Sequence, residues 1–441
     1  MRSRRSLLGN IDWFTVVVFV LLMIMGWLNI YSASYNEAAP SIFDASQEYG
    51  KQFIWMLGAV VIASIILMLD GDFIKRISPI FYGITCVLLV LVLIFGREIN
   101  GAKAWFGFGS FGIQPSEFSK VGISLLLAHY LSSSEAQFSS MRSKLISAAI
   151  ILFPAMLIML QPDTGTVLVF AAFILVLYRE GLSGNILLLG LLAAILSVLS
   201  LLLKSTEVGI PFSDYAVPGH YVLMFIIALI TVVAFFAIGK MVLPRFRKRN
   251  YALLLATAIG SLLFIATLDQ LFENVLEPHQ KIRINILLGL EEDPLGAGYN
   301  VKQSQTAIGS GGFSGKGYLE GTLTKFKYVP MQSTDFIFCT IGEEWGFIGS
   351  ASVILIFLVL MIRLVIIAER QRSKFTRIYG YAVACIFFMH LLINIGMAIG
   401  LAPVIGIPLP FFSYGGSSLW GFTMLLFILI KLDTERLVVL R

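Results

Sequence analysis

The chain contains 441 residues, of which 58% are hydrophobic and 13% are charged, and its mean hydropathy is +0.87. A water-soluble protein keeps roughly a quarter of its residues charged, so this composition excludes a soluble enzyme, a disordered chain and a coiled coil. Three scattered cysteines and four isolated histidines form no pattern typical of a disulfide framework or of a zinc site.

Apolar runs of about membrane-spanning length recur along the whole chain. Each run is expected to be a helix, because the interior of a bilayer offers the backbone no hydrogen-bond partner. We therefore predict an all-α, polytopic helical bundle in a single membrane domain over residues 1–441. The predicted spans are, in chain order, 12–33, 52–70, 77–96, 116–132, 145–161, 164–179, 184–203, 221–239, 251–270, 346–367, 378–399 and 418–432.

Lysine and arginine residues gather in alternate connections between these twelve spans, which is the pattern of connections that face the cytoplasm. The alternation predicts an even number of spans with both termini in the cytoplasm. The net charge of +6 then follows from membrane topology, and the basic connections indicate anchoring and not nucleic-acid binding. The basic segments are the N-terminus, 75–76, 142–144, 179, 240–249, 363–377 and 431–441.

The connections on the opposite, outer side differ from ordinary linkers. The longest, 271–345, is rich in Gly and Lys, and loops of this length are usually functional or disordered. It contains too many aromatic residues for disorder, so we expect a functional loop. The connections at 97–115 and 400–417 are also distinctive. Gly107–Gly112 has the letters of a dinucleotide-binding fingerprint without the βαβ unit around it, so we reject that function.

The first of four polar clusters is Gln114-Pro115-Ser116-Glu117-Phe118-Ser119-Lys120. Its proline and first serine suit the start of a helix. Glu117 and Lys120 lie three residues apart on one helix face and can pair. Two interpretations are open: a structural ion pair that neutralises two charges inside the membrane, or a role in a substrate cavity.

The second cluster, Gln161 to Thr166, interrupts two apolar runs and is expected to form a tight turn or a broken helix at the outer surface. Asp163 can cap the helix that follows. Alternatively, Asp163 faces the cavity and binds a cation, a sugar hydroxyl or Lys120. We favour the cavity, because the segment lies between spans on both sides.

The third cluster lies in the long outer loop and centres on an acidic turn. An acid followed by Pro294 and closely spaced glycines is fixed on a sharp turn, so Asp293 is the positioned carboxylate. Glu291 and Glu292 are expected to be solvated.

The same cluster, which runs from Arg283 to Asp335, contains candidate ligands for an anionic substrate. Its glycines allow backbone N–H groups to approach an anion, and Lys316 and Arg283 add positive charge. Gln303, Ser304 and Asp335 are further candidate substrate-binding residues. The alternative interpretation is a flexible Gly-rich lid with incidental charges.

The fourth cluster, Pro403 to Ser418, combines prolines and glycines with aromatic residues. It is expected to be a re-entrant or interfacial loop. For most of its residues we favour a rigid connector that is anchored in the headgroup layer.

Four strings in this order, on an outward-facing bundle, resemble the SEDS family (shape, elongation, division and sporulation) over nearly the whole chain. Each is weakly specific alone, and together they are highly specific. Residues 307–312 and 315–317, with Asn-Ile-Asp-Trp-Phe at 10–14, are more similar to the rod-shape branch (RodA) than to the division branch (FtsW). The strings are Gln-Pro-Ser-Glu-x-x-Lys, Gln-Pro-Asp-x-Gly-Thr, Asp-Pro-x-Gly-x-Gly-Tyr and Pro-Leu-Pro-x-x-Ser-Tyr-Gly-Gly-Ser.

The resemblance implies a peptidoglycan glycosyltransferase of the bacterial inner membrane that polymerises lipid II for cell-wall elongation. It also implies work beside a class B penicillin-binding protein and other membrane proteins of the elongation complex. The family's essential acid matches Asp293, and Glu117, Lys120 and Asp163 match polar positions of its central cavity. The family usually has ten spans, so the hairpin at 221–270 is expected to be an addition.

The implied reaction needs a base and a site for the leaving group. Asp293 is the candidate general base for the acceptor hydroxyl. Arg283, Lys316 and Lys120 are candidates to neutralise the leaving pyrophosphate, and a divalent cation (Mg²⁺ or Mn²⁺) held by acids is an alternative. A single prominent carboxylate suits inversion better than retention. Two other functions remain open, a flippase or transporter of a lipid-linked precursor and a nonenzymatic scaffold.

Overall fold

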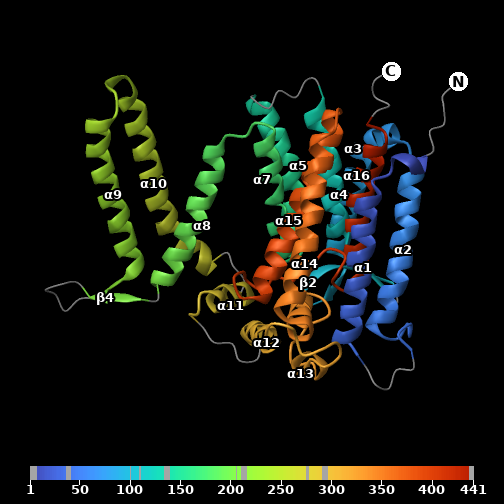
Figure 1. Ribbon diagram of the computed structural model, residues 1–441. Helices are drawn as coiled ribbons and strands as arrows, with labels where there is room; N and C mark the ends of the chain where they lie inside the picture. The colour runs from blue at the N-terminus through green and yellow to red at the C-terminus, as the bar shows by residue number, and fades with distance from the viewer. Residues whose placement is uncertain are drawn as a thin grey trace. The chain divides into compact units, whose positions relative to one another are not determined.

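A computed structural model describes residues 7–35, 41–99, 101–108, 111–133, 140–204, 206–209, 216–274, 278–290 and 296–436. The described residues are almost entirely helical (Figure 1). The chain divides into two compact units: the first comprises 1–182 and 300–441, and the second comprises 183–299.

The first unit is a bundle of helices with one small antiparallel sheet. Its helices are the 3₁₀ helix η1 (Leu7–Asn10), α1 (Trp13–Ala33), α2 (Glu48–Met68), α3 (Gly71–Phe95), α4 (Pro115–Ser132), α5 (Met141–Met159), α6 (Thr164–Val169), α7 (Ala172–Arg179), most of α12 (Ala297–Ser310), α13 (Thr322–Lys325), α14 (Ile337–Glu369), α15 (Lys374–Ala398) and α16 (Gly416–Thr434). The sheet has the strand order β1-β2-β3 and consists of β1 (Arg97–Ile99), β2 (Ala102–Phe108) and β3 (Phe111–Ile113).

The second unit consists of long helices joined by a two-stranded hairpin. Its elements are α8 (Gly184–Lys204), β4 (Glu207–Gly209), β5 (Ala216–Pro218), α9 (Gly219–Met241), α10 (Pro244–Asn274) and α11 (Pro278–Leu287). A small cluster of buried residues, Leu196, Leu223 and Ile265, joins α8, α9 and α10. Most other apolar side chains of these three helices point outward, as expected for helices surrounded by lipid.

Helices cover all twelve predicted spans, and within the described part of the chain ten of them are long and apolar enough to cross a membrane. The protein is therefore a multi-pass membrane protein. The two that fall short correspond to 116–132 and 164–179. The first is α4, whose side chains are mostly buried inside the bundle, where polar residues are shielded from lipid. The second is divided into α6 and α7.

Several helices begin earlier than predicted, and the largest differences are at the starts of α14 and α10. α14 begins at Ile337 and not near 346, and Gly346 interrupts its helical geometry with a φ of +61°. The additional turns include Glu343 and Glu344, and both acids are buried inside the protein. α10 begins at Pro244, so most of the predicted basic turn at 240–250 is helical.

The basic connections of the first unit meet at the end where α1 begins and α16 ends, which we name the terminal end (Figure 1). Arg363 on α14 binds Asp12 before α1, with 2.7 Å between Nη2 and Oδ2. Arg179 on α7 binds Glu369 on α14 at 3.1 Å. The sequence predicts that the terminal end faces the cytoplasm.

The polar clusters of the first unit meet at its opposite end, which we name the motif end. There the Gln114 N–H before α4 donates to the Ser417 hydroxyl of α16 at 3.1 Å. The Ser413 hydroxyl donates to the Thr334 carbonyl at 2.6 Å, which joins the segment before α14 to the segment before α16. Segments that are far apart in the sequence therefore form one surface.

Helix α4 occupies the centre of the first unit, in contact with α3, α5, α15 and α16. Its close packing against α16 depends on a glycine: a Cβ at Gly421 would lie 3.2 Å from the Glu117 carbonyl oxygen. This central position explains why α4 carries polar side chains that a lipid-facing helix would exclude.

Candidate functional site

Two of the predicted site residues, Arg283 and Asp293, belong to the second unit. Asp293 lies outside the described residues, as do its neighbours Glu291 and Glu292. Arg283 lies on α11 and is half-buried. The predicted role of Asp293 therefore stays a prediction, and the geometry of the candidate site is that of the motif end of the first unit.

Glu117 and Lys120 form a buried ion pair within α4. The Lys120 Nζ lies 2.7 Å from Glu117 Oε2. Lys120 is 1% exposed and Glu117 is 3% exposed. Lys120 also lies 3.0 Å from His390 Nε2 on α15, and its ammonium lies 4.8 Å from the centre of the Phe422 ring on α16. One cation therefore holds three helices together, with an anion, an imidazole and a ring face as its partners.

His390 and Asn394 connect this pair to the surface of the motif end. His390 Nδ1 lies 3.0 Å from the Pro408 carbonyl and donates to it, so its Nε2 is the acceptor for Lys120. Asn394, one turn later on α15, donates to the carbonyls of Ile407 at 2.7 Å and of Asp335 at 2.9 Å. Both residues fix backbone segments that precede α14 and α16.

Asp163 caps α6 and joins it to α4. Its carboxylate accepts hydrogen bonds from the Thr166 N–H at 3.1 Å and the Thr166 hydroxyl at 2.8 Å. Across the bundle, it accepts from Gln114 Nε2 at 3.0 Å and from the Ser116 hydroxyl at 3.3 Å. The first two polar clusters of the sequence are thus in direct contact, and Asp163 has the capping role that was one of its two predicted alternatives.

We expect Asp163→Ala to lower the free energy of unfolding by about 2 kcal/mol, the upper end of the range for a helix cap, because α6 loses its cap and the start of α4 loses two hydrogen bonds to the same carboxylate. Asp70→Ala is the matched control, since Asp70 caps α3 through one exposed bond to the Asp72 N–H. Thermal unfolding in detergent micelles measures both variants. Equal losses would contradict a joining role for Asp163.

Lys316 is paired with a buried acid that the sequence did not single out. Its Nζ lies 2.6 Å from Glu343 Oε1 and 2.8 Å from the Thr322 hydroxyl. Glu343 is fully buried and also accepts from the N–H groups of Leu323 and Thr324, both at 2.9 Å. Lys316 is therefore the counter-ion that allows Glu343 to be buried.

The Gly-rich segment before α13 is fastened to the start of α14. The N–H groups of Lys316 and Gly317 donate to the carbonyls of Glu343 and Glu344, each at 3.0 Å. At Gly315 the φ is +82°, and a Cβ would lie 2.1 Å from the Glu344 carbonyl, so only glycine fits. The N–H groups of Lys316 and Gly317 therefore bond within the fold in this structure.

Glu344 is a second buried acid that the sequence interpretation missed. It is 2% exposed, accepts a hydrogen bond from the Ser32 hydroxyl of α1, and its Oε2 has no hydrogen-bond partner among the described residues. The signal was present in the sequence as Gly342-Glu343-Glu344-Trp345-Gly346, two acids beside an apolar run. Acids in that position are expected to face protein.

The remaining predicted residues of the first unit lie near the end of α15. The buried Ser304 donates to the Ala398 carbonyl at 2.8 Å, and Gln303 beside it is half-buried. Asp335 is half-buried, and its carbonyl is the acceptor for Asn394. These residues border the motif end without contacting Lys120.

The described residues contain no group of three His, Cys, Asp or Glu side chains that could hold a metal ion. The divalent cation considered from the sequence stays a prediction.

The comparisons with known proteins agree with this arrangement. A family model described as a cell cycle protein, FtsW/RodA/SpoVE, matches residues 12–210 and 219–437. The peptidoglycan glycosyltransferase RodA of Treponema pallidum (strain Nichols) is 34% identical over 441 residues, which cover 97% of this chain and 99% of the relative. The peptidoglycan glycosyltransferase MrdB of Escherichia coli (strain K12) is 29% identical over 404 residues, with 90% and 88% covered.

A solved structure gives the same result. A chain from a peptidoglycan synthase complex, described as coordinating polymerization and crosslinking, superimposes with a TM-score of 0.67 at 26% identity, covering 97% of this chain and 98% of that one. The family match extends over both units and includes the Gln-Pro-Ser-Glu and Gln-Pro-Asp clusters that meet at Asp163. This chain therefore belongs to the FtsW/RodA/SpoVE family of cell cycle proteins, the SEDS family that its four motifs resemble.

Proposed function

We propose that this protein is a peptidoglycan glycosyltransferase that polymerises lipid II into glycan strands for cell-wall elongation. The observation that carries the proposal is similarity over nearly the whole chain to RodA and MrdB, both named as peptidoglycan glycosyltransferases. The fold adds support, because the family's polar motifs in the first unit meet at one end of a membrane bundle.

In the proposed reaction, the hydroxyl of an acceptor sugar attacks the anomeric carbon of a lipid-linked donor. The bond from that carbon to the pyrophosphate oxygen breaks, and undecaprenyl pyrophosphate leaves. Asp293 accepts the hydroxyl proton, and the new glycosidic bond forms with inversion because the reaction is a single displacement at the anomeric carbon. Arg283 is the proposed ligand of the leaving pyrophosphate. Lys120 and Lys316 act indirectly, because their ammonium groups already serve Glu117 and Glu343.

We further propose that the motif end faces the outside of the bacterial inner membrane and that both termini are cytoplasmic. The basic residues gathered at the terminal end support this orientation. An alkaline phosphatase fused to the C-terminus that was active in living cells would contradict it.

A class B penicillin-binding protein is the proposed partner. The similar chain from a peptidoglycan synthase complex supports an assembly that couples polymerisation with crosslinking. The lipid-facing side chains of α14 offer apolar surface where a membrane helix of a partner can pack, among them Phe347, Leu355 and Ile362.

The proposal predicts polymer from purified components. We expect the protein in detergent, supplied with lipid II and no membrane gradient, to form glycan strands, and we expect more product with a class B penicillin-binding protein present. Gel electrophoresis of labelled lipid II measures the products. Translocation of lipid II across liposomes with no polymer under any condition would instead indicate a transporter.

A further inference from the structure

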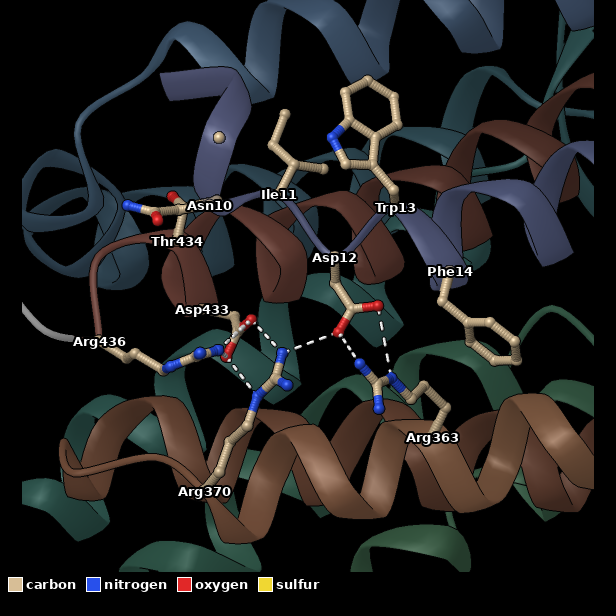
Figure 2. A pocket seen from close by; sticks show the side chains of 11 residues that line it. Asn10, Ile11, Asp12, Trp13, Phe14, Arg363, Arg370, Asp433, Thr434 and Arg436 are labelled. Carbon is tan, nitrogen blue, oxygen red and sulfur yellow. Dashed lines mark hydrogen bonds and ion pairs between the residues drawn. The ribbon is translucent and has the colours of Figure 1, made fainter. Parts of the chain in front are cut away.

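A cavity of about 280 Å³ lies at the terminal end, away from the motif end (Figure 2). The start of α1, the end of α14 and the end of α16 line it. Figure 2 shows two carboxylates, Asp12 and Asp433, between the guanidinium groups of Arg363, Arg370 and Arg436. The proposed glycosyltransferase reaction uses none of these five residues.

The hydrogen-bond capacity of Asp12 is fully used within the protein. It accepts from the Thr15 N–H at 3.2 Å, from Arg363 Nε and Nη2 at 3.3 and 2.7 Å, and from Arg370 Nη2 at 2.8 Å. Burial opposes ionisation of Asp12, but these hydrogen bonds outweigh burial and hold the pKa of the carboxyl below its usual value. Asp12 is therefore a buried anion with no need of a further partner.

Asp433 is satisfied in the same way. It accepts from Arg370 Nε at 2.9 Å, from Arg370 Nη2, from Gln371 Nε2 at 2.6 Å, and from Arg436 Nη1 at 3.0 Å to both of its oxygens. Its side chain is 0% exposed. Neighbouring guanidinium groups offset the negative charges of both acids.

Each of the three arginines has N–H donors that no described residue accepts. Their side chains are 30%, 27% and 33% exposed for Arg363, Arg370 and Arg436. The Nη1 groups of Arg363 and Arg370, and Nε and Nη2 of Arg436, make no hydrogen bond with any described residue. Among the described residues that line the cavity, three cations face two anions, which leaves one excess positive charge, and the exposed edges are guanidinium N–H groups.

Aromatic side chains beside the cavity favour a position of the cavity near the lipid headgroups. Trp13 and Phe14 begin α1 and are 54% and 51% exposed, and aromatic side chains at the start of a spanning helix mark the interface between membrane and water. The Arg363 guanidinium carbon lies 5.6 Å from the centre of the Phe14 ring, which connects the cationic cavity with the lipid-facing side of the helix.

We propose that this cavity binds the phosphate group of an anionic phospholipid from the leaflet on the side of the two termini. Guanidinium groups match phosphate oxygens in geometry and charge, and basic pockets between membrane helices are suited to phospholipid headgroups. The volume fits part of a headgroup, since it is slightly smaller than pockets for whole drug-sized ligands. The bound lipid joins the start of α1 to the ends of α14 and α16.

The test compares retention of phosphatidylglycerol by the full-length protein and three variants. Asn10→Asp adds a negative charge to the lining of the cavity and keeps its size and every arginine–aspartate bond. Arg436→Gln removes the excess cation. Arg249→Gln is the matched control, because Arg249 is an exposed arginine on α10 in the second unit. Native mass spectrometry counts bound lipid during titration, with phosphatidylcholine and inorganic phosphate in parallel arms.

We expect wild type and Arg249→Gln to retain phosphatidylglycerol similarly, and each cavity variant to bind it about tenfold or more weakly, because a charge-assisted hydrogen bond is lost or opposed. Thermal unfolding without lipid verifies that each variant is folded. Equal retention by all four proteins would overturn the proposal. Retention of phosphatidylcholine as tight as that of phosphatidylglycerol would also overturn it. So would binding of inorganic phosphate that depends on Arg436 if phosphatidylglycerol is not bound.

Discussion

Asp293→Asn is expected to lower the rate of lipid II polymerisation by about a hundred- to ten-thousandfold, the usual effect of losing a general base. The amide has nearly the same size as the carboxylate and cannot accept the proton of the acceptor hydroxyl. Asp293 is followed by Pro294 and closely spaced glycines, a pattern that predicts a sharp turn, and it matches the family's essential acid. The measurement is glycan formation from labelled lipid II by purified protein.

Glu292→Gln is the matched control, because it removes the same charge one residue earlier, where the sequence predicts a solvated side chain. It should retain most of the activity. Both variants should unfold at the wild-type temperature, since a turn residue of this kind supports no predicted core. Wild-type polymerisation by Asp293→Asn would refute the assignment of the base.

Lys120→Met is expected to destabilise the protein by about 3–5 kcal/mol, because it leaves the Glu117 carboxylate buried without its counter-ion. His390 also loses the donor to its Nε2. Methionine fills nearly the same volume, so the loss is electrostatic and not a packing defect. The midpoint of thermal unfolding in detergent micelles measures it.

The double variant Glu117→Gln with Lys120→Met distinguishes a structural pair from a substrate-binding one. It removes both charges, so it should recover most of the lost stability. If polymerisation recovers with stability, the pair acts through the fold. If the double variant is stable and inactive, Lys120 or Glu117 contributes directly to the site. A single Lys120→Met as stable as wild type would contradict the buried ion pair itself.

The hydrophobic pattern predicted the fold class well, because long apolar runs can adopt only one structure in lipid. Every predicted span contains helix, and the family that the four motifs resemble is confirmed. The errors are at the boundaries. The apolar run predicted a span that begins near 346, but α14 begins at Ile337 and includes two acids, which Lys316 and Ser32 bind from elsewhere in the chain.

The polar residues also show that the sequence reveals contacts within one helix more readily than contacts between helices. The sequence identified Glu117 and Lys120 by their spacing on one helix face, and the structure confirms the pairing. His390 was counted as isolated, although it and Asn394 lie one turn apart in an apolar run. Their partners, Lys120 and the carbonyls at 335, 407 and 408, are 13 to 270 residues away in sequence and outside α15, so no local pattern predicts the contacts.

The sequence alone determined which segments enter the membrane and which polar clusters the family shares, because hydropathy and motif spacing are local properties. Only the tertiary structure decided which charges neutralise one another. A buried charge must find its partner wherever the fold brings one, so Asp12 meets Arg370 and Lys316 meets Glu343 across long stretches of chain. The cationic cavity at the terminal end exists for the same reason, since α1, α14 and α16 contribute its residues and bring them together only in the folded bundle.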